Sequence, residues 1–407
     1  MCVQTGWKMC ATVRKVGVPV SCKTRQIVIP DILHVIEDFS CANTGITAVV
    51  AQLAGWQAGQ GVRVGVYSTG KPDVKAPAGV DLFWDESFRY PASWRCPAGF
   101  AERLEVTVRR HGYNVLHLHG FWRAAPWVAQ RVASRLRVPT VLTVHGQVES
   151  WAWHGQGRFK AWKKSLYWRL AGRKVLQSVS LVHAITPLEK QHLTSLFPGH
   201  EIVVIPNAVN LADFPTQSQG KDVPKHFFLF LGRIHPVKRI DWLIGSFAQA
   251  SLPEDWELVI AGPEEDAAHA KALRALAAEL GVRDRMRFVG TVYGDEKIRW
   301  LRSAWALVAP SYSEVVGMVN LEAAACYTPS ITTRETGLLD WEEGGGLLVS
   351  GKDYASLPKA LRKAAEWSLQ ERLLRGERSR RLVAERYSLD RVGQQWLEVY
   401  QGLGRAG

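Results

Sequence analysis

Short runs of Val, Ile and Leu alternate with helical stretches along almost the whole chain. The runs include "VRVGVYSTG", "VLHLHG" and "TVLTVHG", and each ends in Gly or His. Runs that are apolar on both faces indicate strands buried in a parallel sheet, because helices cover both faces of such a sheet. Helical text between the runs, as in 123–136 and 158–177, supplies these covering layers. The pattern predicts an α/β fold built on doubly wound parallel sheets.

A second unit of the same kind follows the polar stretch 215–225. Its expected strands are "HFFLFLGR" (226–233), "ELVIAGP" (257–263), "MRFVG" (286–290), "WALVAPS" (305–311) and "PSITT" (329–333), with helices at 238–250, 267–280, 295–303 and 354–388. A chain of 407 residues exceeds the size at which a single core usually stops growing. We therefore expect two Rossmann-like domains that face a central cleft.

The boundaries of these domains follow from the same pattern. The N-terminal domain should cover residues 27–205 and be joined by a C-terminal helix at 389–407. The second domain should cover residues 206–388. Residues 1–26 show no clear period and hold three of the six cysteines, so we expect a loose leader there.

Positive charge is concentrated in the first half of the chain. The net charge is +13; residues 1–200 carry 25 Lys and Arg against 11 Asp and Glu, and the remainder carries 26 against 27. A basic half is typical of proteins that meet nucleic acid, an anionic membrane surface or an acidic substrate. We find no recognised nucleic-acid module, so nucleic acid is not an expected partner.

Cysteine spacing and apolar run length indicate the compartment. The six cysteines show no paired spacing, which argues against a zinc site or a disulfide framework and fits a reducing compartment. No apolar run approaches the roughly 20 residues of a membrane span, and the first residues lack the apolar segment of a secretory signal. We expect a cytoplasmic protein.

Two cations follow the first strand of the second unit. In "FLGRIHPVKRID" the strand ends at Gly232, and Arg233 and Lys238 come after it. Arg offers a planar fork of donors and Lys a compact charge. Near a helix N-terminus at the mouth of a sheet, the pair suits a diphosphate. The alternative is two solvated cations, since Lys and Arg are mostly exposed.

Two glutamates lie eight positions apart in "SYSEVVGMVNLEAAAC" (311–326). If all eight steps were helical, Glu314 and Glu322 would stand about 12 Å apart along the axis, close to the length of a nucleotide sugar from hexose to ribose. Carboxylates accept hydrogen bonds from sugar hydroxyls, and backbone amides around Gly317 are free at a helix start. The alternative is a first-turn Glu favoured by the helix dipole beside an exposed helical Glu.

Histidines occupy the ends of two expected strands. His119 lies at the exit of one strand and His145 at the end of the next, whereas His117 is interpreted as a satisfied core residue. A strand-end His in a cleft either donates to a phosphate or accepts a hydroxyl proton. No Asp-x-Asp pair occurs in the chain, so a divalent metal for a diphosphate is not supported.

A basic stretch rich in Trp precedes the domain boundary. Seven cations at 158–177 share a helix with Trp162, Leu166, Trp168 and Leu170, and two more Trp residues come just before it. Basic residues interleaved with Trp suit the headgroup layer of a membrane, so we expect a peripheral contact through 151–177. The alternative is that residues 162, 166 and 170 face the core, with solvated Lys opposite.

Taken in order, these motifs resemble glycosyltransferase family 4, the retaining enzymes of the GT-B fold. "IPNAVN", "GRIHPVK", "LVIAGP", "RFVGTV" and the E-x7-E pattern of 314–322 follow the family's order, and the resemblance covers roughly residues 28–403. "HGFW…TVHGQVESWAWHG" also resembles the acceptor-side domain of members that build bacterial surface polysaccharides.

The resemblance implies roles for individual residues. Arg233 and Lys238 would hold the donor diphosphate, Glu314 would bind hydroxyls of the transferred sugar, and Glu322 would bind the ribose. Gly45 would approach the β-phosphate, and His119 would lie next to the sugar. His119, Glu314, Arg233 and Lys238 are thus the catalytic candidates.

The other implied contacts are spread over several loops. Donor contacts would come from Val316, Gly317, Met318 and Val319 for the phosphate and sugar, and from Gly262, Val289, Gly290 and Thr291 for the base. His145 and Trp122 are candidates on the acceptor side. The family's turn commonly reads E-G-F-G, but here valines follow Glu314. Since Val does not readily adopt φ > 0, the shape of this loop and the hexose preference are open.

We therefore expect a retaining glycosyltransferase of the bacterial polysaccharide type (lipopolysaccharide, exopolysaccharide or capsule). It would move a hexose-type sugar from a UDP- or GDP-linked donor to a glycan or lipid-linked acceptor, without cofactor or metal, in the cytoplasm or at the inner face of the plasma membrane. Three alternatives remain: a GT-B sugar-nucleotide epimerase or hydrolase, a basic nucleic-acid-binding protein, and an inactive transferase-like scaffold.

Overall fold

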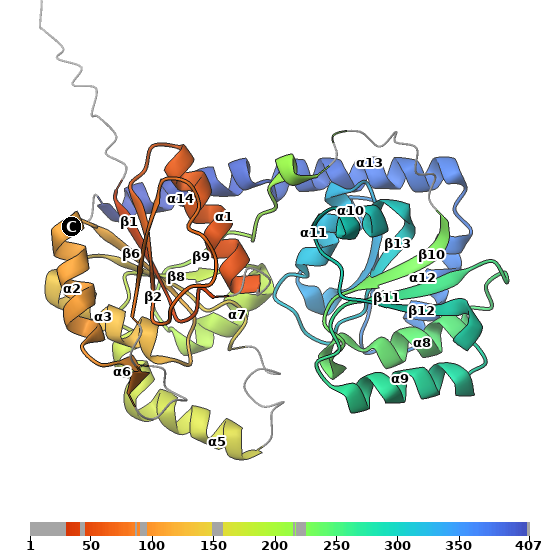
Figure 1. The fold of residues 1–407 in the computed structure, drawn as a ribbon, viewed down its shortest axis with the longest axis horizontal. Coiled ribbons are helices and arrows are strands. Elements are labelled where there is room, and N and C mark those ends of the chain that lie inside the picture. Colours follow the sequence, from red (N-terminus) through yellow and green to blue (C-terminus); the bar gives the residue numbers. More distant parts are fainter. Residues whose placement is uncertain are drawn as a thin grey trace, which may run out of the picture.

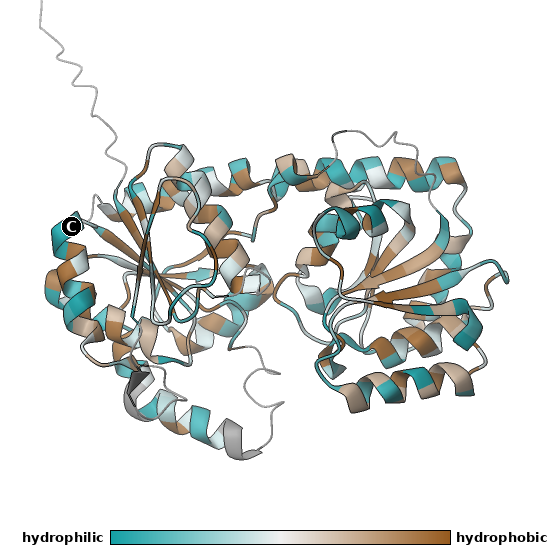
Figure 2. Ribbon diagram, viewed as in Figure 1, coloured by the Kyte–Doolittle hydropathy of each residue, from teal (hydrophilic) through white to brown (hydrophobic). Residues whose placement is uncertain are grey.

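The chain forms two α/β domains, each built on one parallel sheet (Figure 1). The computed structural model describes residues 30–404 except 41–44, 86–87, 90–95, 149–157, 215 and 217–224. The strands of both sheets are mainly hydrophobic in Figure 2, as expected for strands covered on both faces. The prediction of two doubly wound parallel sheets is confirmed, and the expected leader at 1–26 lies outside the described residues.

The N-terminal sheet has seven strands in the order β3-β2-β1-β6-β7-β8-β9. Their bounds are β1 Ile32–Ile36, β2 Val64–Ser68, β3 Val80–Trp84, β6 Val115–His119, β7 Thr140–Thr143, β8 Leu181–Ala184 and β9 Ile202–Val204. A two-stranded antiparallel sheet of β4 (Phe88–Arg89) and β5 (Cys96–Pro97) accompanies it. Strand order reverses between β1 and β6, which makes this position the topological switch point of the sheet.

Helices cover both faces of this sheet. They are α1 Gly45–Gly59, α2 Phe100–His111, α3 Ala124–Leu136, α5 Arg158–Tyr167, a π-helix Trp168–Gly172, α6 Arg173–Leu176 and α7 Pro187–Leu196. One face packs on α2 and α3 through a core that includes Leu33 and Leu116. The other face packs on α1 through a core that includes Ile32 and Val115. The single helix expected over 158–177 is divided by the π-helical turn.

The C-terminal sheet has six strands in the order β12-β11-β10-β13-β14-β15. Its strands are β10 Lys225–Leu231, β11 Glu257–Ala261, β12 Met286–Gly290, β13 Ala304–Ala309, β14 Ser330–Thr333 and β15 Leu347–Val349. Its helices are α8 Ile240–Gln249, α9 Ala267–Glu279, α10 Gly294–Ser303, α11 Met318–Ala325, α12 Ser356–Ala365 and α13 Leu369–Arg386. The switch point of this sheet lies between β10 and β13. The helical stretch expected at 354–388 is two helices, because Ser368 caps a new start at α13 by accepting from the Glu371 amide at 3.1 Å.

The last helix, α14 (Leu389–Gly404), returns to the N-terminal domain (Figure 1). Its residues Trp396, Leu397 and Tyr400 are buried in the same core as α1. The chain therefore crosses between the domains twice. The two crossings are joined by hydrogen bonds from Val209 N to Tyr387 O at 2.9 Å and from Leu389 N to Val209 O at 3.0 Å.

Candidate active site

A cleft of about 630 Å³ lies between the domains. The N-terminal domain lines it with segments that follow β1, β6 and β7, and the C-terminal domain lines it with loops that follow β10, β11 and β12. The polar and glycine residues of the lining are Glu37, Asp38, Gly45, Thr47, His119, Gly120, Arg123, Gln147, Arg233, Glu265 and Tyr293. These segments include the carboxyl ends of strands at the N-terminal switch point, which is where doubly wound sheets bind ligands. Of the predicted residues, Gly45, His119 and Arg233 line this cleft.

Lys238 and Glu314 form an ion pair at the C-terminal switch point. Lys238 ends a 3-10 turn, Pro236–Lys238, after β10, and Glu314 lies in the loop after β13. Ser311 Oγ donates to the same carboxylate oxygen of Glu314 at 2.8 Å, and the paired side chains are only 19% and 14% exposed. The structure thus brings together two predicted residues that are 76 positions apart.

The surroundings of Lys238 lower the pKa of its ammonium group. Burial, followed by repulsion from the nearby Arg233 guanidinium, lowers the pKa of the Lys238 ammonium to about 8. Arg233 itself pairs with Glu265 at 3.1 Å at an exposed position. An additional anion beside both cations would favour their charged forms.

Glu322 lies on α11 and pairs with Lys297 of α10 at 2.9 Å. Because α11 begins at Met318, the first half of the eight-residue step from Glu314 to Glu322 is a loop. The continuous helix on which the 12 Å axial separation was conditional is therefore absent between Glu314 and Met318. The alternative that made Glu314 a first-turn residue of this helix is wrong.

The two valines after Glu314 adopt ordinary backbone angles, since neither belongs to the described residues with positive φ. Val316 is 8% exposed and packs in a core with Leu321 and Leu338. Gly317 caps α11 at φ −75°. A Cβ there would lie 2.6 Å from Asn320 Nδ2 and 2.8 Å from Glu314 Oε2. The turn therefore needs its glycine for space and not for a left-handed backbone.

Three glycines join the ends of β10, β11 and β12. Gly232 N donates to Ala261 O at 2.9 Å, and Gly262 N donates to Gly290 O at 2.7 Å. A Cβ on Gly262 would lie 1.8 Å from Gly232 O, and its φ is +148°. Only glycine permits both this contact and this φ, so the close approach of these loops requires glycine at position 262.

The remaining donor candidates lie outside the lining of the interdomain cleft. Met318 and Val319 begin α11 and are half-buried, while Val289 packs against the C-terminal core. Gly290 has φ +75°, and Thr291 next to it is exposed. These positions surround the carboxyl edge of the C-terminal sheet.

Sequence reasoning missed several charged residues of the cleft. Glu37 and Asp38 directly follow β1, and Arg123, which precedes α3, pairs with Glu37 at 3.5 Å. Glu265 and Tyr293 enter from loops of the C-terminal domain. The signal for Glu37 and Asp38 was their position after a buried strand, because ligands gather at the carboxyl ends of parallel strands.

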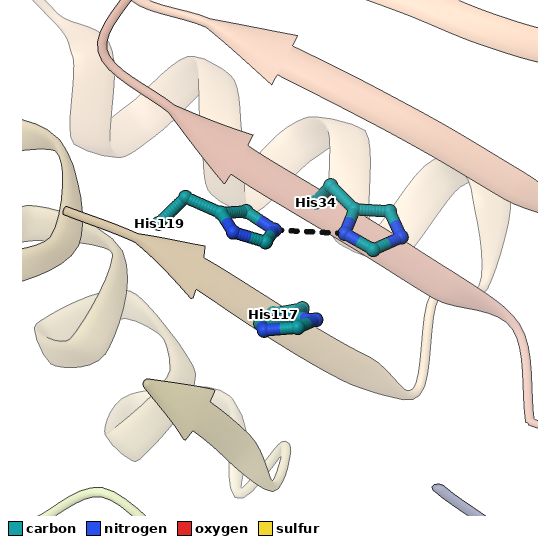
Figure 3. A group of neighbouring side chains, drawn as sticks. All are labelled: His34, His117 and His119. Carbon is teal, nitrogen blue, oxygen red and sulfur yellow. Dashed lines mark hydrogen bonds between the residues drawn. The ribbon is translucent and has the colours of Figure 1, made fainter. Parts of the chain in front are cut away.

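Histidines form a buried cluster behind the cleft. Figure 3 shows His34 of β1 together with His117 and His119 of β6. They lie on one face of the sheet because β1 and β6 pair in parallel with His34 opposite His117. Their ligand nitrogens lie within 4.8 Å of one another, which is close enough for a metal ion.

Hydrogen bonds account for all six ring nitrogens of these three histidines. His34 contacts Gln57 and His119, both at 2.9 Å, and His117 contacts Tyr400 and Thr143, both at 2.7 Å. The second nitrogen of His119 contacts His145 Nε2 at 2.9 Å. A metal ion would have to replace these bonds, so the donor set fits a hydrogen-bonded cluster better than a metal site. The interpretation of His117 as a satisfied core residue is confirmed.

Burial keeps the cluster neutral. Desolvation lowers the pKa of His34 and of His183 to about 4 and that of His145 to about 3. It also lowers the pKa values of His117 and His119 well below the usual range, with neighbouring imidazoles adding to the effect. At neutral pH each ring therefore has one N–H and one lone pair.

The acceptor-side candidates lie near the cleft without lining it. Trp122 donates from Nε1 to Gln147 O at 2.6 Å, and Lys164 of α5 stacks over its ring. His145 is half-buried, follows β7 and has a left-handed backbone at φ +52°. Such a backbone is uncommon for a residue with a side chain and often marks a functional position.

The basic helix α5 projects from the N-terminal domain (Figure 1). Trp162 is 59% and Leu166 is 39% exposed, whereas Trp168 is buried. The alternative in which 162 and 166 face the core is therefore wrong for these two residues. Residues 151–157 of the expected membrane contact lie outside the described residues. None of the helices in the described part of the chain combines the length and apolarity of a membrane span.

Two family models match most of the chain. Residues 44–208 match the glycosyl transferase 4-like domain, and residues 213–380 match the glycosyl transferases group 1. These matches follow the division into the two sheets.

Individual proteins are also similar to this chain, in sequence or in fold. A D-inositol 3-phosphate glycosyltransferase of Frankia alni is 31% identical over 363 residues, which cover 79% of this chain and 87% of that protein. Sucrose-phosphate synthase from Thermosynechococcus elongatus has a TM-score of 0.73 at 21% identity, with 93% and 100% of the two chains covered. Anabaena HepE in complex with UDP-glucose has a TM-score of 0.71 at 17% identity, with 92% and 100% covered.

Proposed function

Because this chain belongs to the family 4 glycosyltransferases of the GT-B fold, we propose that it moves a hexose-type sugar from a nucleoside diphosphate to a glycan or lipid-linked acceptor, with retention at the anomeric carbon. The acceptor belongs to bacterial surface polysaccharide synthesis in the cytoplasm, in keeping with the motifs of the N-terminal domain. HepE, a neighbour in fold, was solved with UDP-glucose, which makes UDP sugars the first donors to test.

The observation that carries this proposal is the pair of cations after β10. Burial, followed by repulsion from Arg233, lowers the pKa of Lys238. A diphosphate between them would offset this repulsion and accept charge-assisted hydrogen bonds from both side chains. Glu314, held by Lys238 and Ser311, would then receive sugar hydroxyls, and Glu322 the ribose hydroxyls.

The proposed reaction is a front-face displacement. The bond from the anomeric carbon to the leaving phosphate oxygen breaks, and the acceptor oxygen forms its bond on the same face of the sugar. The acceptor proton passes to the leaving phosphate oxygen. Arg233 and Lys238 stabilise the charge that develops on the diphosphate. No step requires a metal or cofactor.

The diphosphate role is tested by Arg233→Ala with Arg287→Ala as a matched control. Arg287 is also an exposed arginine of the C-terminal domain, paired with Glu257 at 2.8 Å. A thermal-shift panel of UDP and GDP sugars first identifies the donor by the stabilisation it gives. Release of nucleoside diphosphate from that donor should then fall by about 10²–10³-fold in Arg233→Ala and stay unchanged in Arg287→Ala. Equal turnover in both variants would remove Arg233 from the reaction.

A requirement for an acceptor distinguishes transfer from the alternatives. A transferase should release nucleoside diphosphate much faster once a glycan or lipid-linked acceptor is added. Full turnover without any acceptor would identify a hydrolase or an epimerase.

We further propose that α5 docks on an anionic membrane. Trp162 and Leu166 are exposed on the same helix as Lys163, and aromatic and basic side chains together favour the headgroup layer. Trp162→Ser should weaken co-sedimentation with vesicles that contain phosphatidylglycerol at low salt, whereas Trp84→Ser, an exposed Trp on β3, should not. Equal loss in both variants, or no sedimentation of the native protein, would exclude α5 as the docking element.

A further inference from the structure

The buried polar groups behind the cleft form two series of hydrogen bonds, and the first begins at a backbone carbonyl. Ile205 O accepts a hydrogen bond from His183 Nε2 at 2.8 Å. A carbonyl only accepts, so His183 carries its proton on Nε2 and its Nδ1 holds a lone pair. Thr143 Oγ1, 2.8 Å away, must then donate to that lone pair. This fixes the direction of the first link.

The same reasoning extends the series to α14. Because the Thr143 hydroxyl proton is used, its oxygen accepts from His117 Nε2 at 2.7 Å. His117 Nδ1 therefore accepts from the Tyr400 hydroxyl at 2.7 Å. The first series therefore ends at the Tyr400 hydroxyl, which donates to His117.

A second series begins at the Gln57 side chain. Its Oε1 lies 2.9 Å from His34 Nε2, and because an amide oxygen only accepts, His34 carries its proton on Nε2. His34 Nδ1 then accepts from His119 Nε2, and His119 Nδ1 accepts from His145 Nε2, both at 2.9 Å.

The second series ends at His145, whose Nδ1 makes no hydrogen bond with another described side chain. We propose that these two series of hydrogen bonds, one fixed by Ile205 O and one by Gln57 Oε1, hold all five histidines as the Nε2–H tautomer, and that the second series presents the lone pair of His145 Nδ1 as its open end. Gln57 and His34 are positioning residues that act on His145 through His119. Both nitrogens of His119 are used within the chain, so His145 provides the open imidazole nitrogen.

The tautomer of His145 decides which of the two roles of a strand-end histidine it can have. An Nδ1 lone pair cannot donate to a phosphate, and it can receive a hydroxyl group. His145 Nδ1 would therefore accept a hydrogen bond from a sugar hydroxyl or from a water, and it would not bind an anion. The identity of that hydroxyl as part of a sugar rests on the proposed function, whereas the tautomer does not.

The tautomers are measured directly in the full chain labelled with ¹⁵N-histidine. Long-range ¹H–¹⁵N spectra at neutral pH separate protonated from unprotonated ring nitrogens, and single His→Gln variants assign the rings. His34, His117, His119, His145 and His183 should each show protonated Nε2 and unprotonated Nδ1. A protonated Nδ1 on His145 would overturn the proposal, whatever the enzyme's activity.

Substitution of Gln57 tests the connection. In Gln57→Met, His34 loses its acceptor, and His119 and His145 should become mixtures of tautomers. Gln57→Glu still offers an acceptor to His34 and should restore the native tautomers of both. The matched control is Gln130→Met, a buried amide of the same domain that bonds Ser178 at 2.9 Å, which should leave the spectra unchanged.

A second variant tests the proposal even if Gln57→Met does not fold. Thr143→Val removes the hydroxyl that joins His117 to His183, so the tautomer of His117 should change. Thr107→Val, which removes an exposed hydroxyl on α2 bonded to Arg103 O, serves as its control. Native tautomers in both Gln57→Met and Thr143→Val would refute the chain.

Discussion

Lowering the pH from 7 to 5 should strongly destabilise the N-terminal domain. The pKa values of His34 and His183 are lowered to about 4 by burial, against about 6.5 in the unfolded chain. Below pH 6.5 the unfolded state therefore binds more protons than the folded state. Their contribution to stability is lost as pH falls from about 6.5 to about 4, below which the folded state also takes up protons.

The size of the loss follows from these two groups. At pH 5 the unfolded chain is about 1.5 pH units below its histidine pKa, which corresponds to about 2 kcal/mol for each ring. His34 and His183 together cost about 4 kcal/mol, and His117 and His119 shift in the same direction. Domains are stable by only about 5–15 kcal/mol, so this loss is a large part of the stability of the N-terminal domain.

The assay is urea unfolding followed by circular dichroism at several pH values between 7 and 5. The free energy of unfolding should fall by at least about 4 kcal/mol over this range. His183→Gln should be less stable at neutral pH and should show a shallower pH dependence, by about one proton. Gln130→Met, which removes no titrating group, should keep the native pH dependence. A change below about 1 kcal/mol in the native protein would show that the rings are not held neutral.

Two further substitutions test the packing of the C-terminal domain. Gly262→Ala should lower the melting temperature sharply or prevent folding, because its Cβ would meet Gly232 O at 1.8 Å. The control is Gly402→Ala, an open helical position in α14, which should stabilise the protein by about 0.5–1 kcal/mol. Equal melting temperatures of the two variants would contradict the close approach of Gly262 to Gly232. Arg372→Met should cost about 3 kcal/mol or more in urea unfolding, because the buried guanidinium donates to the carbonyls of Ala304, Trp305 and Tyr327; a loss below about 1 kcal/mol would mean that these carbonyls find other donors.

Local pattern was sufficient for most of the fold. The apolar runs at 115–120 and 286–290 became β6 and β12, and the helical stretch at 267–280 became α9. β3, β8, β9 and β15, together with the two-residue strands β4 and β5, were not predicted from the sequence. β3 carries exposed and half-buried side chains, so it lacks a continuous apolar run, and β15 has only three residues.

The candidate site was predictable where its residues follow strands. Arg233 and Lys238 come after a buried strand, and the parallel-sheet rule gives the edge on which they meet. The ion pair of Lys238 with Glu314 required the tertiary structure, because residues 76 positions apart become neighbours only when β10 and β13 pair.

The sequence by itself determined the two parallel sheets and the cations after β10, because these depend on local periodicity. The tertiary structure alone decided the histidine chain. Four neighbouring strands place His34 opposite His117, and Thr143 opposite both His119 and His183, and Tyr400 comes from a helix that has crossed from the other domain. Strand register is a non-local property, so no motif in the sequence could have shown which groups set the tautomer of each histidine.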